Sequence, residues 1–315
     1  MFDKNNLIYK SVKVKAPASV ANMVCGFDVL GMALSAPYDE MELTITANPG
    51  IVIKHVDAYN LPTVATQNVA GVSLLAMINA LGVDVGFEVV INKIIKPGSG
   101  LGSSAASAAG VVVAANYLLN NYFDKQALVG FAMHGEQLAS GVMHADNITP
   151  CIYGGITLIR ATHPLDIVTL PSPALYVTII HPQIEIKTAD ARQILRKEVQ
   201  LQAAIKQWGN VGGLVAGLFK NDYGLISRSL QDVIVEPVRS MLIPAFDLIK
   251  QASINAGALG GGISGSGPSI FMLSITHDVA QLVEKQMCAI YDKLGIAYHS
   301  HVTTINNDGV KIIME

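Results

Sequence analysis

Residues 96–107 read Lys96-Pro97-Gly98-Ser99-Gly100-Leu101-Gly102-Ser103-Ser104-Ala105-Ala106-Ser107. They follow a β-rich run at 87–93 and lead into small apolar residues that continue without proline to about residue 119, so the pattern predicts a strand, a turn and a helix. Glycines at every second position let the backbone adopt positive φ and approach a ligand closely. Backbone N–H groups at the N-terminus of the helix would then face an anion, so the segment is predicted to bind phosphate.

Two familiar phosphate loops do not fit this segment. It lacks the Gly-Lys-Ser/Thr of a Walker A loop, and its third glycine comes too early for the dinucleotide fingerprint. Ser103 and Ser104 can donate hydroxyl groups to phosphate oxygens or to a hydrated magnesium ion. A plain strand-to-helix turn with Ser103 as the helix cap has the same spacing, and the pattern leaves both interpretations open.

The composition limits the class of protein. With 315 residues, 51% of them hydrophobic, the chain can fill a sizeable core and form two domains. Its 21 basic and 24 acidic side chains give a net charge of -3, so nucleic acid is not an expected partner. The longest weakly polar run, residues 105–115, is too short to span a membrane, and residues 1–6 show no export signal, so we expect a cytoplasmic protein without a membrane partner. Three widely spaced cysteines argue against a disulfide framework or a zinc site.

The periodicity predicts a mixed α+β order of elements. Strands are expected at residues 11–15, 40–46, 51–56, 87–93, 156–160, 175–180, 269–273 and 298–304. Helices are expected at residues 69–80, 103–119, 125–139, 189–220 with breaks at the glycines 209, 212 and 213, before 255, and 279–294. Prolines cluster at 164, 171 and 173. They place a domain boundary near residue 165, which divides the chain into domains 1–165 and 166–315.

A second glycine cluster covers residues 257–269 and formally contains GxGxxG at positions 260, 262 and 265. The dinucleotide fingerprint needs a helix after the glycines, whereas Pro268 and the β-rich residues 269–273 predict a strand. We therefore reject that interpretation. A ligand-facing loop and a long flexible turn both stay open.

A few polar side chains lie in otherwise apolar or turn-rich surroundings. Asp28 can bind an ammonium or hydroxyl group, although Asn22 and Asp28 also suit a local turn. Glu136 is a candidate magnesium ligand, with a solvated helix face as the alternative. Arg192 and Arg239 are candidates to bind a carboxylate through paired hydrogen bonds, although arginines on helices are usually solvated.

Together these segments resemble the superfamily of galactokinases, homoserine kinases, mevalonate kinases and phosphomevalonate kinases, the GHMP kinases. The loop 97–107 is similar to the second motif of the superfamily and residues 263–269 to its third. Within this group the sequence is similar to the homoserine kinases, because four more segments match in the expected order: 16–31, 144–150, 187–192 and 236–239. The resemblance implies a two-domain α+β fold, with an N-terminal domain like domain 2 of ribosomal protein S5 and a ferredoxin-like C-terminal domain.

The resemblance also implies an activity, the ATP-dependent and Mg²⁺-dependent phosphorylation of the hydroxyl group of L-homoserine to O-phospho-L-homoserine in threonine biosynthesis. The nucleotide phosphates would be wrapped by Lys96, Pro97, Gly98, Ser99, Gly100, Leu101, Gly102, Ser103, Ser104, Ala105 and Ala106. Magnesium would be held by Ser104 and Glu136. The amino acid would be surrounded by Asn22, Asp28, His144, Asp146, Asn147, Thr188, Arg192 and Arg239, with Asn147 and Arg192 as catalytic residues. No general base is implied, and a homodimer is the family expectation.

The chemistry of the substrate suits these groups. Asp28 can pair with its ammonium group, and Arg192 and Arg239 with its carboxylate. Lys96 stands where the family usually has proline, and residues 61–72, expected at the adenine pocket, match less well. A sister kinase acting on mevalonate or another polyol is an alternative, which Asp28 and the segment 144–147 disfavour. A catalytically silent sensor or scaffold is another, which the intact loop and both magnesium ligands disfavour.

Overall fold

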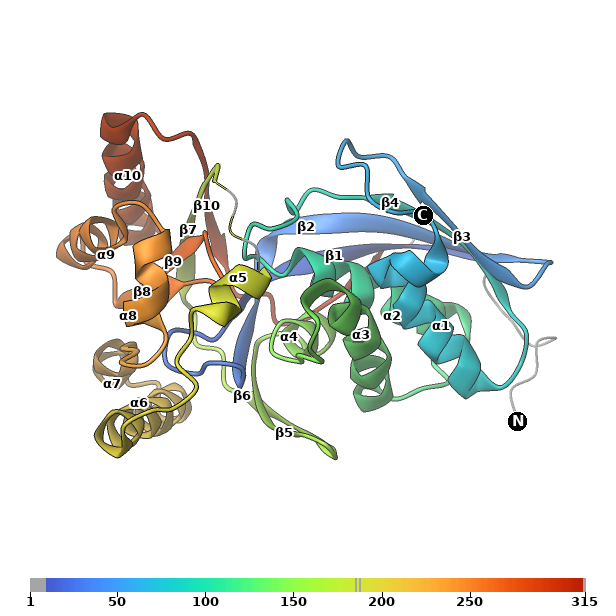
Figure 1. Cartoon of the computed structure of the whole chain (residues 1–315), viewed down its shortest axis with the longest axis horizontal. Coiled ribbons are helices and arrows are strands. Elements are labelled where there is room, and N and C mark those ends of the chain that lie inside the picture. The colour runs from blue at the N-terminus through green and yellow to red at the C-terminus, as the bar shows by residue number, and fades with distance from the viewer. Residues whose placement is uncertain (1–9, 185, 187, 314–315) are drawn as a thin grey trace.

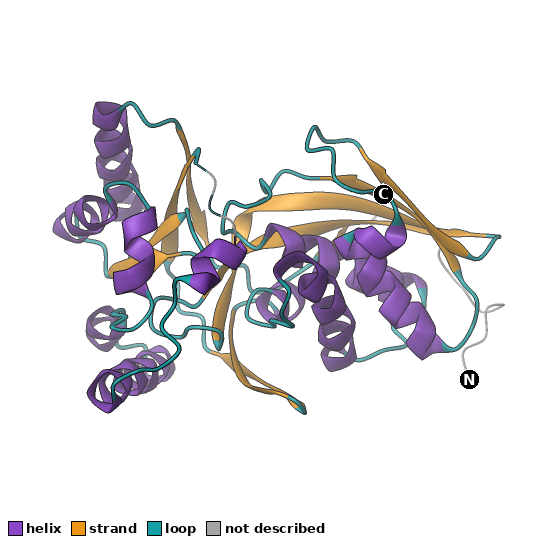
Figure 2. Ribbon diagram, viewed as in Figure 1, coloured by secondary structure: helices purple, strands orange, loops and turns teal. Residues whose placement is uncertain are grey.

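The computed structural model describes residues 10–184, 186 and 188–313, without the side chains of residues 188–190. Two domains lie side by side, each built on its own β-sheet (Figure 1). Helices of the larger domain gather on one side of its sheet (Figure 2). This is the two-domain α+β architecture that the sequence predicts.

The first domain contains a seven-stranded sheet in the order β11-β1-β2-β4-β3, to which β5 adds by pairing with β2 and β6 by pairing with β5. These strands are β1 (Ser11–Ala21), β2 (Leu30–Thr46), β3 (Gly50–His55), β4 (Gly86–Asn92), β5 (Ile156–Thr162), β6 (Leu165–Leu170) and β11 (Lys311–Ile313). Its helices are α1 (Val69–Leu81), α2 (Ser103–Leu118), α3 (Lys125–Ser140) and α4 (Ile148–Tyr153), with the short 3-10 helix η2 (Ala65–Gln67) before α1.

The second domain has a four-stranded antiparallel sheet in the order β10-β7-β9-β8. Its strands are β7 (Tyr176–Pro182), β8 (Gly260–Ile263), β9 (Ile270–Ser274) and β10 (Tyr298–Thr304). Its helices are α5 (Thr188–Gln193), α6 (Leu201–Lys220), α7 (Tyr223–Ser229), α8 (Glu236–Arg239), η3 (Ser240–Leu242), α9 (Phe246–Asn255) and α10 (His277–Leu294).

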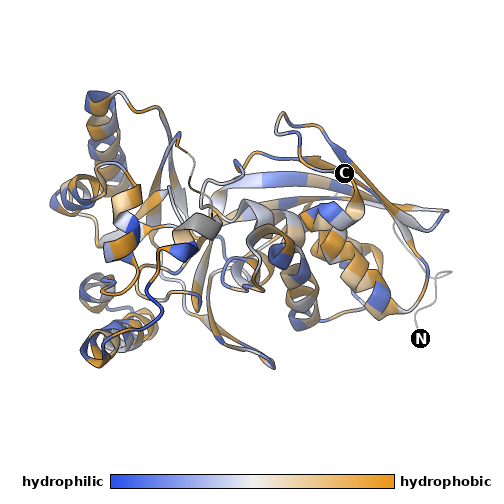
Figure 3. Cartoon of the chain, in the orientation of Figure 1, coloured by the Kyte–Doolittle hydropathy of each residue, from blue (hydrophilic) through white to orange (hydrophobic). Residues whose placement is uncertain are grey.

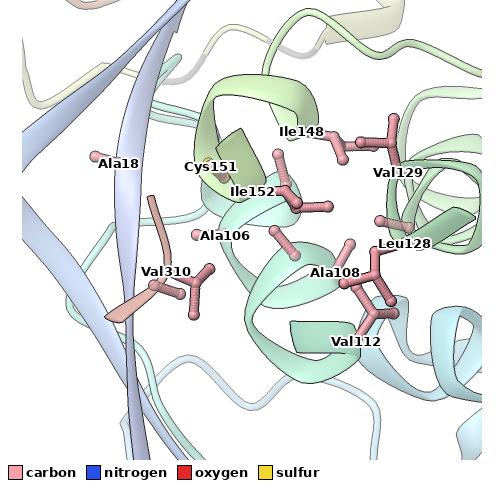
Figure 4. Close-up of a cluster of buried hydrophobic side chains, with 14 of the residues drawn as sticks. Ala18, Ala106, Ala108, Val112, Leu128, Val129, Ile148, Cys151, Ile152 and Val310 are labelled. Carbon is pink, nitrogen blue, oxygen red and sulfur yellow. The ribbon is translucent and has the colours of Figure 1, made fainter. Parts of the chain in front are cut away.

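Helix α2 is the centre of the main core. Its small side chains let neighbouring elements approach closely: a Cβ on Gly110 would lie 2.9 Å from both Ala16 Cβ and Met41 Cε. Figure 4 shows alanines and valines of α2 facing residues of α3 and α4. The same core extends into the second domain through Val177 and Ile179 of β7, so the two domains share buried apolar contacts.

The observed elements differ from those predicted from the sequence at three places. Helix α6 runs unbroken through Gly209, Gly212 and Gly213, because isolated glycines cost a helix only about 1 kcal/mol each and its buried side chains pack against other elements. Residues 260–263 of the second glycine cluster form strand β8 rather than a loop. Short elements such as α4, β6 and β11 carry too few residues for a periodicity to be visible.

Strands from beyond residue 165 belong to the first sheet. β6 extends it to Leu170, and β11 returns to pair with β1 after the second domain has been completed. Within the described residues, none of the helices is both long enough and apolar enough to cross a membrane.

Candidate functional site

A cavity of about 310 Å³ lies between the two domains. The first domain contributes the end of β1, the glycine loop before α2, and residues of α1, α3 and the turn before α4. The second domain contributes Arg192, Arg239, Gly265 and Ser266. We call this space the interdomain cavity.

The two glycine-rich segments meet across the domain boundary. Ser264 Oγ donates a hydrogen bond to the carbonyl oxygen of Gly100 at 2.7 Å, and Ser269 Oγ donates to that of Ser99 at 2.7 Å. Gly100 has a φ of +79°, and a Cβ there would lie 2.6 Å from the carbonyl oxygen of Gly267. Glycine is therefore required at position 100 for both backbone conformation and close approach.

Helix α2 begins at the cavity without a side-chain cap. Its N-cap residue, Gly102, has a φ of 66° and contributes no capping oxygen. The Ser103 hydroxyl donates instead to the carbonyl oxygen of Ile95 at 2.7 Å, so the interpretation of Ser103 as the helix cap is wrong. The first-turn N–H groups of α2 thus have no side-chain partner and suit an anionic ligand.

A buried ion pair fixes the start of α2 to the sheet. Lys93 Nζ donates to the Asp39 carboxylate and, at 2.6 Å, to the carbonyl oxygen of Ser103. Asp39 also accepts the N–H groups of Ile94 and Ile95, each at 2.8 Å. Because both charges are fully buried and hydrogen-bonded, loss of either partner would leave an uncompensated charge beneath the loop.

Two buried carboxyl groups line the cavity beside α2. Ser104 Oγ donates to Glu136 Oε2 at 2.7 Å, and burial raises the pKa of Glu136 to about 7. Burial, together with the charges of Asp28 and Glu136, raises the pKa of Asp146 to about 7. Neither group forms an ion pair with any described residue. A cation bound here would be stabilised by both.

At the other end of the cavity, Asp28 pairs with Arg192. Arg192 Nη2 lies 2.9 and 3.1 Å from the two carboxylate oxygens of Asp28, and His144 Nδ1 lies 3.6 Å from one of them. Burial lowers the pKa of His144, the nearby arginines lower it further and Asp28 opposes them, so the neutral imidazole is favoured. Its Nε2 atom is buried and has no hydrogen-bond partner among the described residues.

Arg239 lies next to this pair and is only 3% exposed. Its Nε atom donates to the carbonyl oxygen of Ala191 and its Nη1 atom to that of Gly265, both at 3.0 Å. The ring of Phe27 lies 5.1 Å from the Arg239 guanidinium carbon and 5.6 Å from that of Arg192. Two guanidinium groups on one aromatic ring form a compact site for a carboxylate.

The turn that carries Asp28 has an unusual backbone. Asn22, Met23, Val24 and Asp28 all have positive φ, which costs energy for residues other than glycine. Asn22 stabilises the turn by accepting the N–H group of Asp28 at 3.0 Å and by donating to Gly265 at 2.9 Å. Asn22 is thus a turn residue, as one interpretation of the sequence expects, and it also ties the turn to the second glycine cluster.

Gln207 on α6 supports the same turn from behind. It is 8% exposed, donates to the carbonyl oxygen of Cys25 at 2.8 Å and accepts the N–H group of Val233 at 2.9 Å. It therefore connects the turn to the segment that leads into Arg239. Cys25 itself is buried, and burial raises its thiol pKa to about 12, so it is not a reactive cysteine.

The end of the cavity nearest α1 has a mixed lining. The apolar residues Leu61, Pro62, Val69 and Ile91 lie there beside the polar residues His55, Gln67 and Asn68. Asn68 caps α1 by accepting the N–H groups of residues 70 and 71, and its amide donates to the carbonyl oxygen of Pro62 at 2.6 Å. This apolar strip beside the glycine loop has the character of a site for a flat aromatic base.

The structure brings most of the predicted site residues together. The cavity is lined by Asn22, Asp28, Pro97, Gly98, Gly100, Gly102, Ser103, Ser104, Glu136, His144, Asp146, Asn147, Arg192 and Arg239. Others lie outside the lining: the Lys96 ammonium donates to Gln183, and buried positions are taken by Ser99, Leu101, Ala105 and Ala106. Thr188 begins α5, and its side chain lies outside the described part of the structure.

Several residues of the site escaped the sequence analysis. Ser19 Oγ donates to Asn147 Oδ1 at 2.8 Å and so orients the Asn147 amide. Lys93, Phe27 and Gln207 act through contacts with segments far away in the sequence, which no local pattern records. Of these residues only Lys93 could have been noticed in the sequence, because it is a charged residue at the end of an apolar strand.

Comparison with known proteins agrees with this geometry. The family model of the GHMP kinase N-terminal domain matches residues 68–155, and that of the GHMP kinase C-terminal domain matches residues 214–293. The fold and the site thus define a GHMP kinase. Comparison with individual proteins and with a solved structure shows which family of GHMP kinases the chain belongs to.

The chain is similar to a homoserine kinase from Chloroherpeton thalassium, with 44% identity over 91% of this chain and 94% of that protein. It is also similar to one from Chlorobaculum tepidum, with 40% identity over 96% and 98% of the two chains. The solved structure of a homoserine kinase from Cytophaga hutchinsonii matches with a TM-score of 0.93 and 50% identity over 97% and 98%. The chain belongs to the homoserine kinase family.

The role of glycine in the loop can be tested with two alanine substitutions. Gly98 and Gly100 both have positive φ, so each change costs about 1 kcal/mol of conformational strain. A Cβ at Gly98 meets nothing within 4 Å, whereas at Gly100 it meets backbone of the second domain. Gly100→Ala is expected to lower the free energy of unfolding by about 1–3 kcal/mol more than Gly98→Ala, measured by urea denaturation. Equal losses would contradict the packing argument.

The protonation of Glu136 gives a second prediction. An acid whose pKa is raised on folding binds its proton more tightly in the folded state, so its ionisation lowers stability as the pH rises from about 4.5 to about 7. Without metal, Glu136→Gln should therefore match the wild type at pH 4.5 and exceed its free energy of unfolding by about 2–3 kcal/mol at pH 8. Urea denaturation at both pH values measures the gap. A gap that does not widen with pH would refute the assignment.

Proposed function

We propose that this protein transfers the γ-phosphoryl group of ATP to the hydroxyl group of L-homoserine, which yields O-phospho-L-homoserine for threonine biosynthesis. The observation that carries the proposal is the interdomain cavity, which has an uncapped helix N-terminus at one end and a pair of arginines beside Asp28 at the other. The full-length similarity to proteins named homoserine kinase supports the same reaction.

The nucleotide would lie along the first domain. The glycine loop from Pro97 to Ser104 and the first turn of α2 would hold the phosphates, since backbone N–H groups and the helix dipole favour negative charge. The apolar strip at Leu61, Pro62 and Val69 would hold the adenine base. Lys93 would keep the start of α2 in place from below.

Magnesium fits the residues beside α2. A hard cation prefers oxygen ligands, and Ser104 Oγ and Glu136 Oε2 lie 2.7 Å apart in the cavity wall. The pKa of Glu136 is raised because its carboxyl group is buried without a neighbouring cation. A bound magnesium ion would lower this pKa. Bound by these two residues, the ion would neutralise charge on the transferring phosphoryl group.

The amino acid would bind by replacing the contact between Asp28 and Arg192 with its own two charged groups. Its ammonium group would bind Asp28, and its carboxylate would bind Arg192 and Arg239, so that both charges of the Asp28–Arg192 pair stay compensated. His144, which lies 3.6 Å from Asp28, and Asp146 would border the same pocket. Thr188 belongs to this pocket in our proposal on the strength of the sequence resemblance alone.

Two residues would act on the transfer itself. The Asn147 amide oxygen is held by Ser19, which leaves its NH₂ group to donate to the acceptor hydroxyl or to the phosphoryl group. Arg192 would stabilise the negative charge that develops as the group moves. Because phosphoryl transfer mainly needs alignment and charge neutralisation, no side chain is assigned as general base.

We also propose that the protein works in the cytoplasm and as a homodimer. The three cysteines, which form no disulfide bonds, support the location, and the family resemblance supports the dimer.

An ADP-release assay tests the proposed reaction. The purified protein with Mg-ATP is given L-homoserine, L-threonine, mevalonate, galactose or shikimate. We expect release with homoserine far above that with the other four. A higher rate with another alcohol would overturn the substrate, and no release with any of them would overturn the activity.

Removal of one arginine tests the carboxylate site. Arg239→Ala should raise the KM for homoserine by a factor equivalent to about 2–3 kcal/mol, since a charge-assisted contact is lost, and leave the KM for ATP nearly unchanged. Arg160→Ala, at an exposed arginine of β5 paired with Asp166, is the control and should change neither value. Equal effects of Arg239→Ala on both substrates would remove the assignment.

A further inference from the structure

His55, Asp57 and Asn68 form a polar cluster at the end of the cavity nearest α1. His55 is the last residue of β3, Asp57 follows two positions later, and Asn68 immediately precedes α1. His55 Nδ1 lies 3.1 Å from Asp57 Oδ2, and His55 Nε2 lies 3.2 Å from the amide nitrogen of Asn68. Only 8% of the His55 side chain and 3% of the Asp57 side chain are exposed. We call these three residues the His55 cluster.

The contacts of Asp57 determine which atoms of the cluster carry protons. Asp57 accepts the N–H groups of Tyr59 at 3.0 Å and of Lys93 at 3.2 Å. Burial raises the pKa of Asp57, but these N–H groups and the ring of His55 lower it more, so the carboxyl group is ionised. The carboxylate therefore accepts a hydrogen from His55 Nδ1. The Nε2 atom of the neutral ring is then free to accept a hydrogen from Asn68.

Asn68 forms hydrogen bonds with three segments of the protein. Its NH₂ group donates to His55 Nε2 and, at 2.6 Å, to the carbonyl oxygen of Pro62. Its oxygen accepts the N–H groups of Ala70 at 2.9 Å and of Gly71 at 3.3 Å. Helix α1 has few polar side chains of its own and is largely orange in Figure 3. The polar contacts at its start therefore depend on the side chain of Asn68.

His55 fixes the orientation of the Asn68 amide. If the amide were reversed, its oxygen would face the lone pair of His55 Nε2 and the carbonyl oxygen of Pro62, and its NH₂ group would face the N–H groups of α1. All of these contacts would be repulsive. An acceptor at position 55 thus favours the single orientation that caps α1 and holds Pro62.

Asp57 connects the cluster to the glycine loop. The Lys93 N–H group that it accepts lies directly after β4, and the Lys93 ammonium group donates to the carbonyl oxygen of Ser103, the first residue of α2. A continuous set of contacts therefore runs from Pro62, in the lining of the cavity, to the start of α2. These contacts fix the spacing between the two ends of the proposed nucleotide site.

We propose that His55 and Asp57 are positioning residues of the nucleotide site. Through Asn68 they hold residues 61–69, which we call the base wall, at the distance from α2 that a nucleotide spans. The inference rests on the proposed function, because it takes ATP as the occupant of the cavity. A wall that is already in place costs less free energy on binding than one that has to be ordered. Loss of His55 should weaken binding of the base and spare the phosphate contacts, since Asp57 keeps its bond to Lys93.

Isothermal titration calorimetry tests the proposal without any turnover. The ligands are Mg-ATP and magnesium tripolyphosphate, which has neither ribose nor base. His55→Ala should raise the dissociation constant of Mg-ATP about tenfold, as expected for one lost hydrogen bond, and that of tripolyphosphate by less than about twofold. His55→Gln, whose amide oxygen can accept from Asn68, should recover most of the ATP affinity. His163→Ala, at an exposed histidine between β5 and β6, is the matched control and should change neither constant.

A double-mutant cycle separates positioning from direct contact with the base. Asn68→Ser keeps a capping oxygen for α1, but its short side chain cannot bond to both His55 and Pro62. If His55 acts through Asn68, adding His55→Ala to Asn68→Ser should raise the ATP dissociation constant by less than about twofold further. Circular dichroism verifies that each variant is folded.

Three results would overturn the inference alone: ATP affinity unchanged in His55→Ala, equal losses of ATP and tripolyphosphate affinity in that variant, or independent effects in the cycle. A wild type that binds no ATP would overturn the proposed function and this inference together.

Discussion

Ser264 and Ser269 of the second domain donate hydrogen bonds to the backbone oxygens of residues 99 and 100 in the first. These bonds engage carbonyl groups whose partial negative charge would oppose a phosphate, and they join the two glycine-rich segments beside the interdomain cavity. Asn22 and Arg239 add to the same junction, because both donate to the carbonyl oxygen of Gly265. The two domains are thus joined beside the interdomain cavity by hydrogen bonds to backbone atoms of two glycine-rich segments.

Charge balance sets the character of the cavity. Glu136 and Asp146 are buried acids without a basic partner among the described residues, and they favour a bound cation. Asp28 and Arg192 are paired with each other, and a zwitterion offers both of them a replacement partner. Lys93 and Asp39, by contrast, compensate one another, and both also bond to neighbouring groups: Lys93 to the Ser103 carbonyl and the Ser107 hydroxyl, and Asp39 to the N–H groups of residues 94 and 95. The buried charges around the cavity thus fall into two groups. Those of Glu136 and Asp146 lack a basic partner in the described part of the chain, whereas those of Lys93 and Asp39 are paired and hold the start of α2 to the sheet.

Much of this could be predicted from the sequence. Hydrophobic periodicity and the positions of glycine and proline predict the α+β order, most helices and strands, and the glycine loop. These features could be predicted because the elements are long and their sequence signals are local. The family resemblance supplied the distant partners Asp28, Arg192 and Arg239. What could not be predicted was created by tertiary contact: Gly260 to Ile263 form a strand because β9 offers them hydrogen bonds, and Gln207 matters because Cys25 folds against it. α6 likewise continues through glycines that would end a shorter or unsupported helix.

Strand β11 has a consequence for how the molecule is made. It pairs with β1 in the first sheet, although residues 171–304, which form nearly all of the second domain, lie between the first sheet's other strands and this one. The segment leading into it also holds the end of α4, where the N–H group of Val310 donates to the carbonyl oxygen of Cys151 at 2.7 Å. During synthesis, β1 therefore lacks its β11 partner and α4 lacks its hydrogen bond from Val310 until the residues after the second domain have left the ribosome. The sheet of the first domain is therefore completed only after the second domain has been synthesised.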